Sequence, residues 1–222
     1  IVAQHPVALL AIRASVGFCL GVFSAAMMAY VYESEGQVGR FASYGSLGWR
    51  AGCAVAATVR NYHALFAVSS AASALAFLLS LTFTEDRKKT VSVSAFPLSL
   101  IRSNFKVYVP FFLRCLGSYA VWTIFPLFLL SIGANRSWVA ILDGINMAFQ
   151  FVLMRYVERF SAATMMTVGL VASVVVFASY GLATHYLQLI PVEVIVAISW
   201  SCLWIGALSF LMTRSVERGT AA

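Results

Sequence analysis

Long apolar runs alternate with short polar gaps along this 222-residue chain. A helix needs about 20 predominantly apolar residues to cross a hydrocarbon core about 30 Å thick, and seven runs approach or exceed that length. Turn-forming and charged residues separate the runs, as in the gaps around Glu33 and Arg60. The pattern predicts an all-α fold, a transmembrane bundle whose seven helices lie over residues 7–31, 38–59, 65–83, 107–131, 138–157, 163–183 and 187–212.

One polar gap is much longer than the others. Residues 84–106 contain a run of charged side chains from Glu85 to Lys89, and this gap separates three predicted helices from four. We therefore expect three regions in the chain. Residues 1–83 hold the end of an N-terminal helical bundle, residues 84–106 form a loop between bundles, and residues 107–222 begin a C-terminal bundle.

The composition agrees with a membrane protein. Hydrophobic residues make up 61% of the chain and charged residues only 10%, whereas about a quarter of the residues in a soluble domain are charged. The net charge of +7 comes from basic residues in the gaps rather than on one amphipathic stripe, so it points to membrane topology and not to nucleic acid. The four cysteines lie inside apolar runs, and we expect neither a disulfide framework nor a metal or other cofactor.

The distribution of Lys and Arg between alternate gaps predicts the orientation. Basic residues in gaps collect on the cytoplasmic side of a membrane protein, and here they are strongly asymmetric. We therefore expect an integral protein of the plasma membrane with residues 84–106 in the cytoplasm. Arg60 and Arg136 lie on one side, and the other side holds Arg40, Arg87, Lys88, Lys89, Arg102, Lys106, Arg155, Arg159, Arg214 and Arg218.

Three polar residues in the run 138–157 share a helix face. Asp143, Asn146 and Gln150 follow one another at spacings of three and four residues. A polar stripe of this kind belongs against a bundle interior or a water-filled path, where its groups can form hydrogen bonds. Two interpretations remain open: a site that binds substrate or protons, and a structural hydrogen-bond network between helices.

Three arginines lie inside apolar runs, where a charge costs at least about 2.5 kcal/mol on insertion scales. Arg114 could hold an anionic substrate in a bidentate pair, or its long side chain could reach the interface. Arg13 lies above a stripe of small residues that favours helix packing, although its side chain could also enter a cavity. Arg50 is deep in its run and needs an anionic partner or a hydrated cavity. Together the arginines favour an anionic or carboxylate-bearing solute.

Two further residues are candidates with strong alternatives. Glu193 follows Pro191 at the outer end of its apolar run, near the start of the run, and we expect it at the outer interface rather than in a coupling role. Trp122 lies inside its run and could line a cavity, because small-molecule sites combine aromatic walls with a few polar groups. Contact with lipid or packing in the core would equally explain Trp122.

The layout resembles that of the major facilitator superfamily, in which two six-helix halves are joined by a charged cytoplasmic loop. Sliding the chain along itself places Gly21 on Gly206, as in a parallel repeat. The segment 17–21 resembles part of the fourth helix of such a transporter, and the segment from Arg155 to Arg159 is similar to the family's Gly-x-x-x-Asp-Arg loop. The resemblance implies that the chain corresponds to helices four to ten, so we expect an internal fragment.

The resemblance implies a secondary active transporter that moves a small solute across the bilayer by alternating access. Coupling to protons is a hypothesis that rests on Asp143. No HExxH, GxSxG or paired metal-ligand motif favours an enzyme. A seven-helix receptor and a non-transporting membrane scaffold remain alternatives, whereas a retinal protein is excluded because no Lys lies in the middle of an apolar run.

Overall fold

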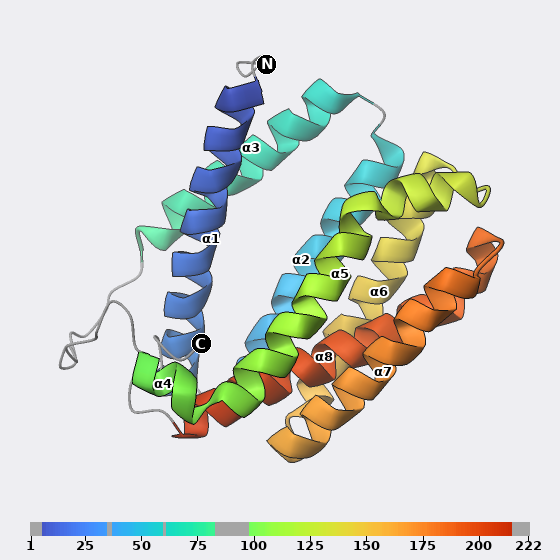
Figure 1. The fold of residues 1–222 in the computed structure, drawn as a ribbon. Coiled ribbons are helices and arrows are strands. Elements are labelled where there is room, and N and C mark those ends of the chain that lie inside the picture. The colour runs from blue at the N-terminus through green and yellow to red at the C-terminus, as the bar shows by residue number, and fades with distance from the viewer. Residues whose placement is uncertain (1–5, 35–36, 60, 83–97, 215–222) are drawn as a thin grey trace.

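The computed structural model describes residues 6–34, 37–59, 61–82 and 98–214, and within these ranges the chain is helical with no β-strand (Figure 1). This confirms the predicted all-α class. Short caps and turns join the helices, as where the Asn135 side chain accepts a hydrogen bond from the backbone N–H of Trp138. The elements are α1 (Pro6–Ser34), α2 (Val38–Thr58), α3 (Tyr62–Ser80), α4 (Leu98–Ser103), α5 (Phe105–Ser131), α6 (Arg136–Val157), α7 (Ala162–Leu182), the 3₁₀ turn η1 (Tyr186–Gln188) and α8 (Leu189–Arg214).

Six of these helices are long and apolar enough to cross a membrane: α1, α3, α5, α6, α7 and the continuous segment of η1 and α8. The expectation of seven such spans was wrong for residues 38–59. That segment does form a helix, α2, but its glycines, serines and two arginines make it less apolar than a membrane span. By length and composition, the chain has the character of a membrane protein.

The predicted inter-bundle loop is shorter than expected at its C-terminal end. Residues 98–103 form the short helix α4, and α5 begins at Phe105. Asn104, between the two helices, is buried. The charge run from Glu85 to Lys89 lies outside the described residues, and the predicted division of the chain into two bundles stays a prediction.

Helices α7 and α8 pack together closely because glycine removes side-chain bulk at their contact. A Cβ atom on Gly169 would lie 2.7 Å from the backbone nitrogen of Leu203, and one on Gly206 would lie 2.9 Å from Cβ of Met165. Small residues allow membrane helices to approach backbone to backbone and to gain van der Waals contact. The main apolar core lies beside this pair, where side chains of α5 and α6 join it; it includes Phe125, Leu129, Leu142, Val176, Leu189 and Val196.

Helix α2 packs along α6, and polar contacts hold the two together at one end. Gly39 lies so close to α6 that a Cβ atom there would overlap the carbonyl oxygen of Met154. The backbone N–H of Gly39 donates a hydrogen bond to the carboxyl of Glu158, so a carboxyl at the end of α6 caps the start of α2. Nearby, Nε of Arg155 donates to Oγ of Ser43 at 3.0 Å.

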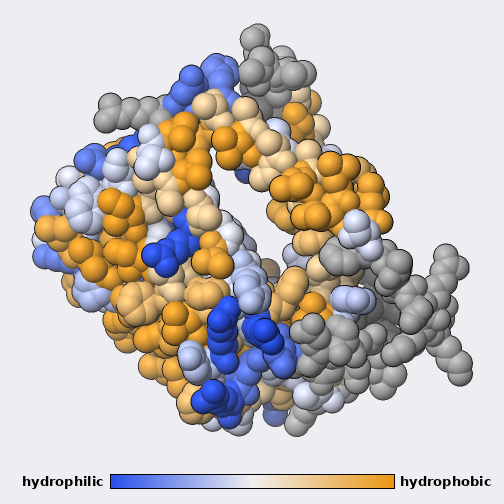
Figure 2. Space-filling view, turned by 180° about the vertical axis from the view of Figure 1, so that it is seen from behind, coloured by the Kyte–Doolittle hydropathy of each residue, from blue (hydrophilic) through white to orange (hydrophobic). Residues whose placement is uncertain are grey.

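Helix α3 and most of α1 stand apart from the helices that pack around α8 (Figure 1). Near the end of α1, Met28 packs with Leu208 and Met212 of α8. No residue of α3 is buried, and large apolar side chains such as Phe18 and Phe66 are exposed. Figure 2 shows an opening between these two parts of the molecule, with hydrophobic residues over much of the surface and hydrophilic ones mainly toward the top and bottom of the view. Apolar helix surfaces of this kind suit contact with lipid or with other membrane helices.

Candidate functional site

A carboxyl group lies inside the helical bundle near the start of α8. The side chain of Glu193 is 0% exposed. The phenol of Tyr180 on α7 donates a hydrogen bond of 2.7 Å to Oε1 of Glu193, and Nδ2 of Asn146 on α6 donates one of 3.1 Å to Oε2. Glu193, predicted at the outer interface of the membrane, is thus enclosed by side chains of neighbouring helices, and its depth in the membrane stays a prediction. Glu193 lies in the first turns of α8 on the side that faces α6 and α7, so the bundle surrounds it.

The hydrogen bonds continue from Asn146 to helix α2. Nε2 of Gln150 donates to Oδ1 of Asn146 at 2.7 Å, and Oγ of Ser46 donates to Oε1 of Gln150 at 3.3 Å. We call the whole series, Tyr180–Glu193–Asn146–Gln150–Ser46, the polar chain. It joins α7, α8, α6 and α2. The predicted common face of Asn146 and Gln150 is confirmed, since both are buried and bonded to each other.

Asp143, the third member of the predicted stripe, lies beside the polar chain rather than in it. Its side chain is half-buried, and no hydrogen bond holds it within the part of the chain that the structure describes. Asp143 does interact electrostatically with Glu193 and with Tyr180. The bundle thus contains two carboxyl groups close enough to influence each other, of which Glu193 is the more enclosed.

The donors around Glu193 are neutral. Tyr180 supplies a phenol O–H and Asn146 an amide N–H, and these two groups take up one oxygen each. Burying a carboxylate is expensive unless it is both hydrogen-bonded and paired with a cation. An enclosed carboxyl with hydrogen bonds but without a cationic partner can hold a proton, and its charge can change when its surroundings change.

Arg114 on α5 forms a second polar cluster with α7 and α8. Its Nε donates to Oγ of Ser173 and its Nη1 to Oγ of Ser118, each at 3.3 Å. Ser173 and Ser199 share a hydrogen bond of 2.6 Å. The guanidinium carbon lies 4.8 Å from the ring centroid of Trp200, a cation–π contact. The Arg114 side chain thus contacts α7 and α8, whereas its predicted roles, binding an anion or reaching the interface, stay predictions.

The side chains that hold Arg114 belong to the middle of the helices. Ser118 is central in α5, Ser173 is central in α7, and Ser199 is close to the centre of α8. The Arg114 guanidinium therefore reaches the central layer of the bundle, although its Cα is nearer the start of α5. Substrate sites of secondary transporters lie at this depth, near the bilayer midplane.

The other predicted site residues are placed differently. Arg13 on α1 and Arg50 on α2 are exposed, and neither joins the Arg114 cluster or the polar chain. Trp122 is half-buried and packs edge-on against Phe125 and Tyr180, with ring centroids 4.8 and 6.3 Å apart. Trp122 therefore belongs to the apolar core and also touches one end of the polar chain.

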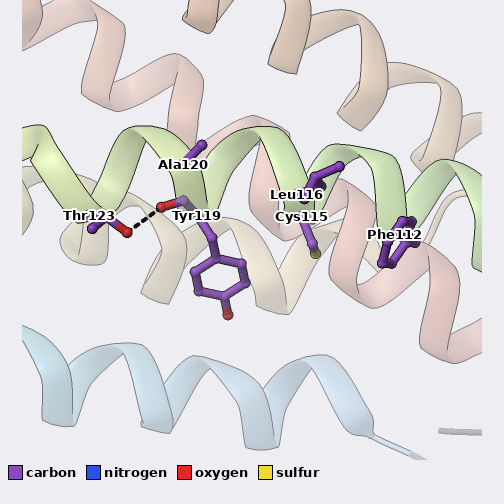
Figure 3. A pocket seen from close by; sticks show the side chains of 6 residues that line it. All are labelled: Phe112, Cys115, Leu116, Tyr119, Ala120 and Thr123. Carbon is purple, nitrogen blue, oxygen red and sulfur yellow. Dashed lines mark hydrogen bonds between the residues drawn. The ribbon is translucent and has the colours of Figure 1, made fainter.

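A shallow hollow of about 490 Å³ runs along another face of α5 (Figure 3). The ring of Tyr119 points away from the helix into this space. Apart from one phenol, one thiol and one hydroxyl, the surface there is apolar, and all of its lining residues belong to α5. The lining residues are Phe112, Cys115, Leu116, Tyr119, Ala120 and Thr123.

Sequence reasoning weighed Glu193 but favoured an interfacial position for it, and it missed Tyr180 and Ser46. A usable signal existed for Glu193, because it is an ionisable residue within a long apolar run and such residues are functional candidates by default. The nearby Pro191 and the end of the run argued instead for an interface. Tyr180 and Ser46 gave no signal, since both residue types are ordinary in membrane helices.

Comparisons of this chain with protein-family models, with curated proteins and with solved structures found no match. The roles of its residues must therefore follow from chemistry and geometry. What the geometry defines is a membrane-type helical bundle with two polar clusters inside it. One cluster is centred on the carboxyl of Glu193 and the other on the guanidinium of Arg114.

Proposed function

We propose that this chain is part of a secondary active transporter that moves a small solute by alternating access, and that Glu193 carries the coupling proton. The observation that carries the proposal is the enclosed carboxyl of Glu193, which among the described residues is hydrogen-bonded only to the neutral groups of Tyr180 and Asn146. Ionisable groups inside membrane helices are costly, and they mark substrate, ion and proton pathways.

The packing of α2 against α6 supports a carrier of the major facilitator type. In the predicted layout these helices belong to different bundles, because the charged stretch of residues 84–106 lies between them in the chain. Alternating access in such carriers is largely a rocking of one bundle against the other around a central site. Contacts between α2 and α6 would then form and separate during each cycle.

The polar chain connects the carboxyl of Glu193 to the contact between α6 and α2, so a change in the protonation of Glu193 can alter that contact. If a proton binds at Oε1 of Glu193, the phenol of Tyr180 can rotate and accept a hydrogen bond instead of donating one. The Nδ2 group of Asn146 can only donate, so it stays with Oε2. The protonated carboxyl thus no longer needs the hydrogen bond from Tyr180. Its neutral oxygen is also a weaker acceptor for the Asn146 amide than a carboxylate oxygen is. Because Asn146 connects through Gln150 to Ser46, the change reaches α2.

The proposal is tested by transport with the full-length protein in liposomes. Vesicles with an inward proton gradient are exposed to a mixture of small organic acids, amines and sugars, and mass spectrometry identifies what accumulates. Wild-type protein should concentrate at least one solute. Glu193→Gln should abolish gradient-driven accumulation yet retain exchange of that solute between equal concentrations, because the glutamine imitates a permanently protonated carboxyl.

Two matched variants sharpen the result. Glu158→Gln makes the same chemical change at the end of α6, outside the polar chain; it should keep proton-driven accumulation, although the rate can change because Glu158 contacts α2. Asp143→Asn compares the two neighbouring carboxyls, and intact accumulation in this variant would remove Asp143 as the coupling group. If wild-type vesicles concentrate no solute, the transport proposal fails; if Glu193→Gln accumulates solute like wild type, only the coupling role fails.

A further inference from the structure

We infer that Arg114 binds the anionic head of the transported solute, and that the hollow along α5 receives the solute's apolar body. The inference rests on the proposed function, because it names the substrate class of the same carrier. It goes beyond that proposal in assigning a binding group and a chemical type of ligand. The solute is a small organic anion, with a carboxylate, sulfonate or phosphate on an apolar or aromatic frame.

The first argument is the charge of Arg114, which neutral groups surround. The guanidinium donates to the hydroxyls of Ser118 and Ser173 and also interacts with the thiol of Cys115. Among the residues that the structure describes, the titratable groups that interact with Arg114 are Cys115, Tyr119 and Tyr180, none of which is a carboxyl group. A guanidinium in the centre of a membrane bundle is costly without an anion. A bound anionic solute would supply the missing charge.

The second argument is the way the serines are arranged. Ser118 donates its own proton to the carbonyl of Cys115 at 3.0 Å, and Ser173 donates to the carbonyl of Gly169 at 2.9 Å. Both hydroxyls therefore present lone pairs to Arg114 and fix its orientation without neutralising its charge. They use two of the five N–H donors of the guanidinium. The rest of the planar fork is suited to bidentate binding of a carboxylate or phosphate.

The third argument is the aromatic support beneath the guanidinium. Trp200 lies under Arg114, and Trp204 stacks on Trp200 with ring centroids 5.4 Å apart and an interplanar angle of 14°. Phe111 packs against both rings. This cluster limits the motion of the guanidinium, so a ligand would meet a group that is already in position. Preorganisation of that kind reduces the entropy lost on binding.

The hollow along α5 lies next to Arg114. Arg114 interacts with Cys115 and lies within electrostatic range of Tyr119, and both of these residues line the hollow. Beyond these two residues, the apolar side chains of Phe112 and Leu116 continue the surface (Figure 3). A ligand with its charge at Arg114 and an apolar frame along α5 matches this order.

Tyr180 places the anion site next to the proton site. Its phenol is bonded to Glu193 and lies within electrostatic range of Arg114. The proposed anion group and the proposed proton group therefore meet at one side chain, the phenol of Tyr180.

Equilibrium binding tests the inference without requiring transport. The purified full-length protein is titrated with benzoate, benzenesulfonate and phenyl phosphate, and with uncharged benzamide as the matched control. Tryptophan fluorescence and thermal stability are recorded. At least one anion should bind and raise the melting temperature, whereas benzamide should do neither. Arg114→Gln should weaken anion binding by about tenfold or more, since a charge-assisted hydrogen bond is lost.

Control variants separate a local effect from general damage. Arg50→Gln removes the same charge from an exposed position and should bind the anions like wild type. Arg114→Lys keeps the positive charge but loses the planar guanidinium with its paired N–H donors, and should bind the anions with intermediate affinity. If Arg114→Gln does not fold, the lysine variant and the comparison of benzoate with benzamide still decide the question. Equal binding of benzoate and benzamide, or no binding of any anion, would overturn the inference.

Anionic lipid is the other possible source of the charge, and nanodiscs distinguish it. Protein in phosphatidylcholine nanodiscs should bind the soluble anions without added phosphatidylglycerol. If only phosphatidylglycerol stabilises the protein, and only when Arg114 is present, the site belongs to lipid and the inference is wrong. A failed proton-driven uptake with intact Arg114-dependent binding would refute the proposed carrier function alone. Intact uptake with Arg114-independent binding would refute only the anion site.

Discussion

The phenol of Tyr180 donates a 2.7 Å hydrogen bond to the carboxyl of Glu193 across the contact between α7 and α8. Tyr180→Phe removes this donor and leaves Oε1 of Glu193 enclosed without it. We expect a loss of about 1–2 kcal/mol in the free energy of unfolding, measured by thermal or denaturant unfolding in detergent. Tyr119→Phe removes a phenol from the open hollow and should leave the stability unchanged. Equal stability of both variants would show that the Tyr180 bond contributes little.

The close approach of α7 and α8 depends on Gly169. Adding a methyl group there would place it 2.7 Å from the nitrogen of Leu203 and 2.9 Å from the carbonyl oxygen of Ser199, and backbone atoms cannot move aside cheaply. Gly169→Ala should destabilise the protein by about 1–3 kcal/mol. Gly181→Ala is the matched control on the same helix, because a Cβ there meets nothing within 4 Å. Comparable melting temperatures for the two variants would contradict the packing described here.

Helices α2 and α6 can be linked covalently at Gly144. A Cβ atom on this residue would lie 3.9 Å from Cβ of Cys53, within the usual Cβ–Cβ range of disulfides. Gly144→Cys should therefore form a disulfide with Cys53 on mild oxidation, detected by mass spectrometry of the digested protein. If the carrier works by separating these helices, the disulfide should stop solute uptake and a reductant should restore it.

The control for this link is the same variant in a Cys53→Ser background, which cannot form the disulfide and should transport regardless of the oxidant. Failure of the two cysteines to pair would contradict the placement of α2 on α6. Uptake that continues at an unchanged rate in the fully crosslinked protein would instead contradict alternating access through this interface.

Glu158 should make the stability of the protein depend on pH. Burial raises the pKa of this carboxyl, and the hydrogen bond from the backbone of Gly39 opposes the shift only in part. The fold therefore favours the protonated form. The contribution of the group to stability is present below its ordinary pKa and is lost as the pH rises through the raised pKa of the folded state.

Glu158→Gln imitates the protonated carboxyl and keeps an oxygen that can accept from Gly39. We expect the variant to melt at a higher temperature than wild type at neutral pH, with the difference shrinking at acidic pH. Glu158→Ala lacks the acceptor and should melt lower than the glutamine variant at every pH. A difference between wild type and the glutamine variant that does not change with pH would argue against this assignment.

The sequence by itself determined the helical class and the position of most helices. The structure confirms the runs that predicted α5, α6 and α7 to within two residues at each end, because turn residues and charges interrupt a continuous apolar pattern. It also determined that Asn146 and Gln150 share a face, since the 3.6-residue period of a helix fixes side-chain directions relative to its own axis. Apolarity was less reliable for α2, in which the small residues Gly39, Ser43 and Ser46 contact α6.

Only the tertiary structure decided which polar groups meet. Asn146 bonds to Glu193, 47 residues away on another helix, and Arg114 bonds to Ser173 on a third. Periodicity cannot supply these pairs, because it does not set how each helix is rotated against its neighbours. That rotation follows from close packing at positions such as Gly169, where two backbones touch. The same packing turned Glu193 into the bundle and left Arg50 exposed.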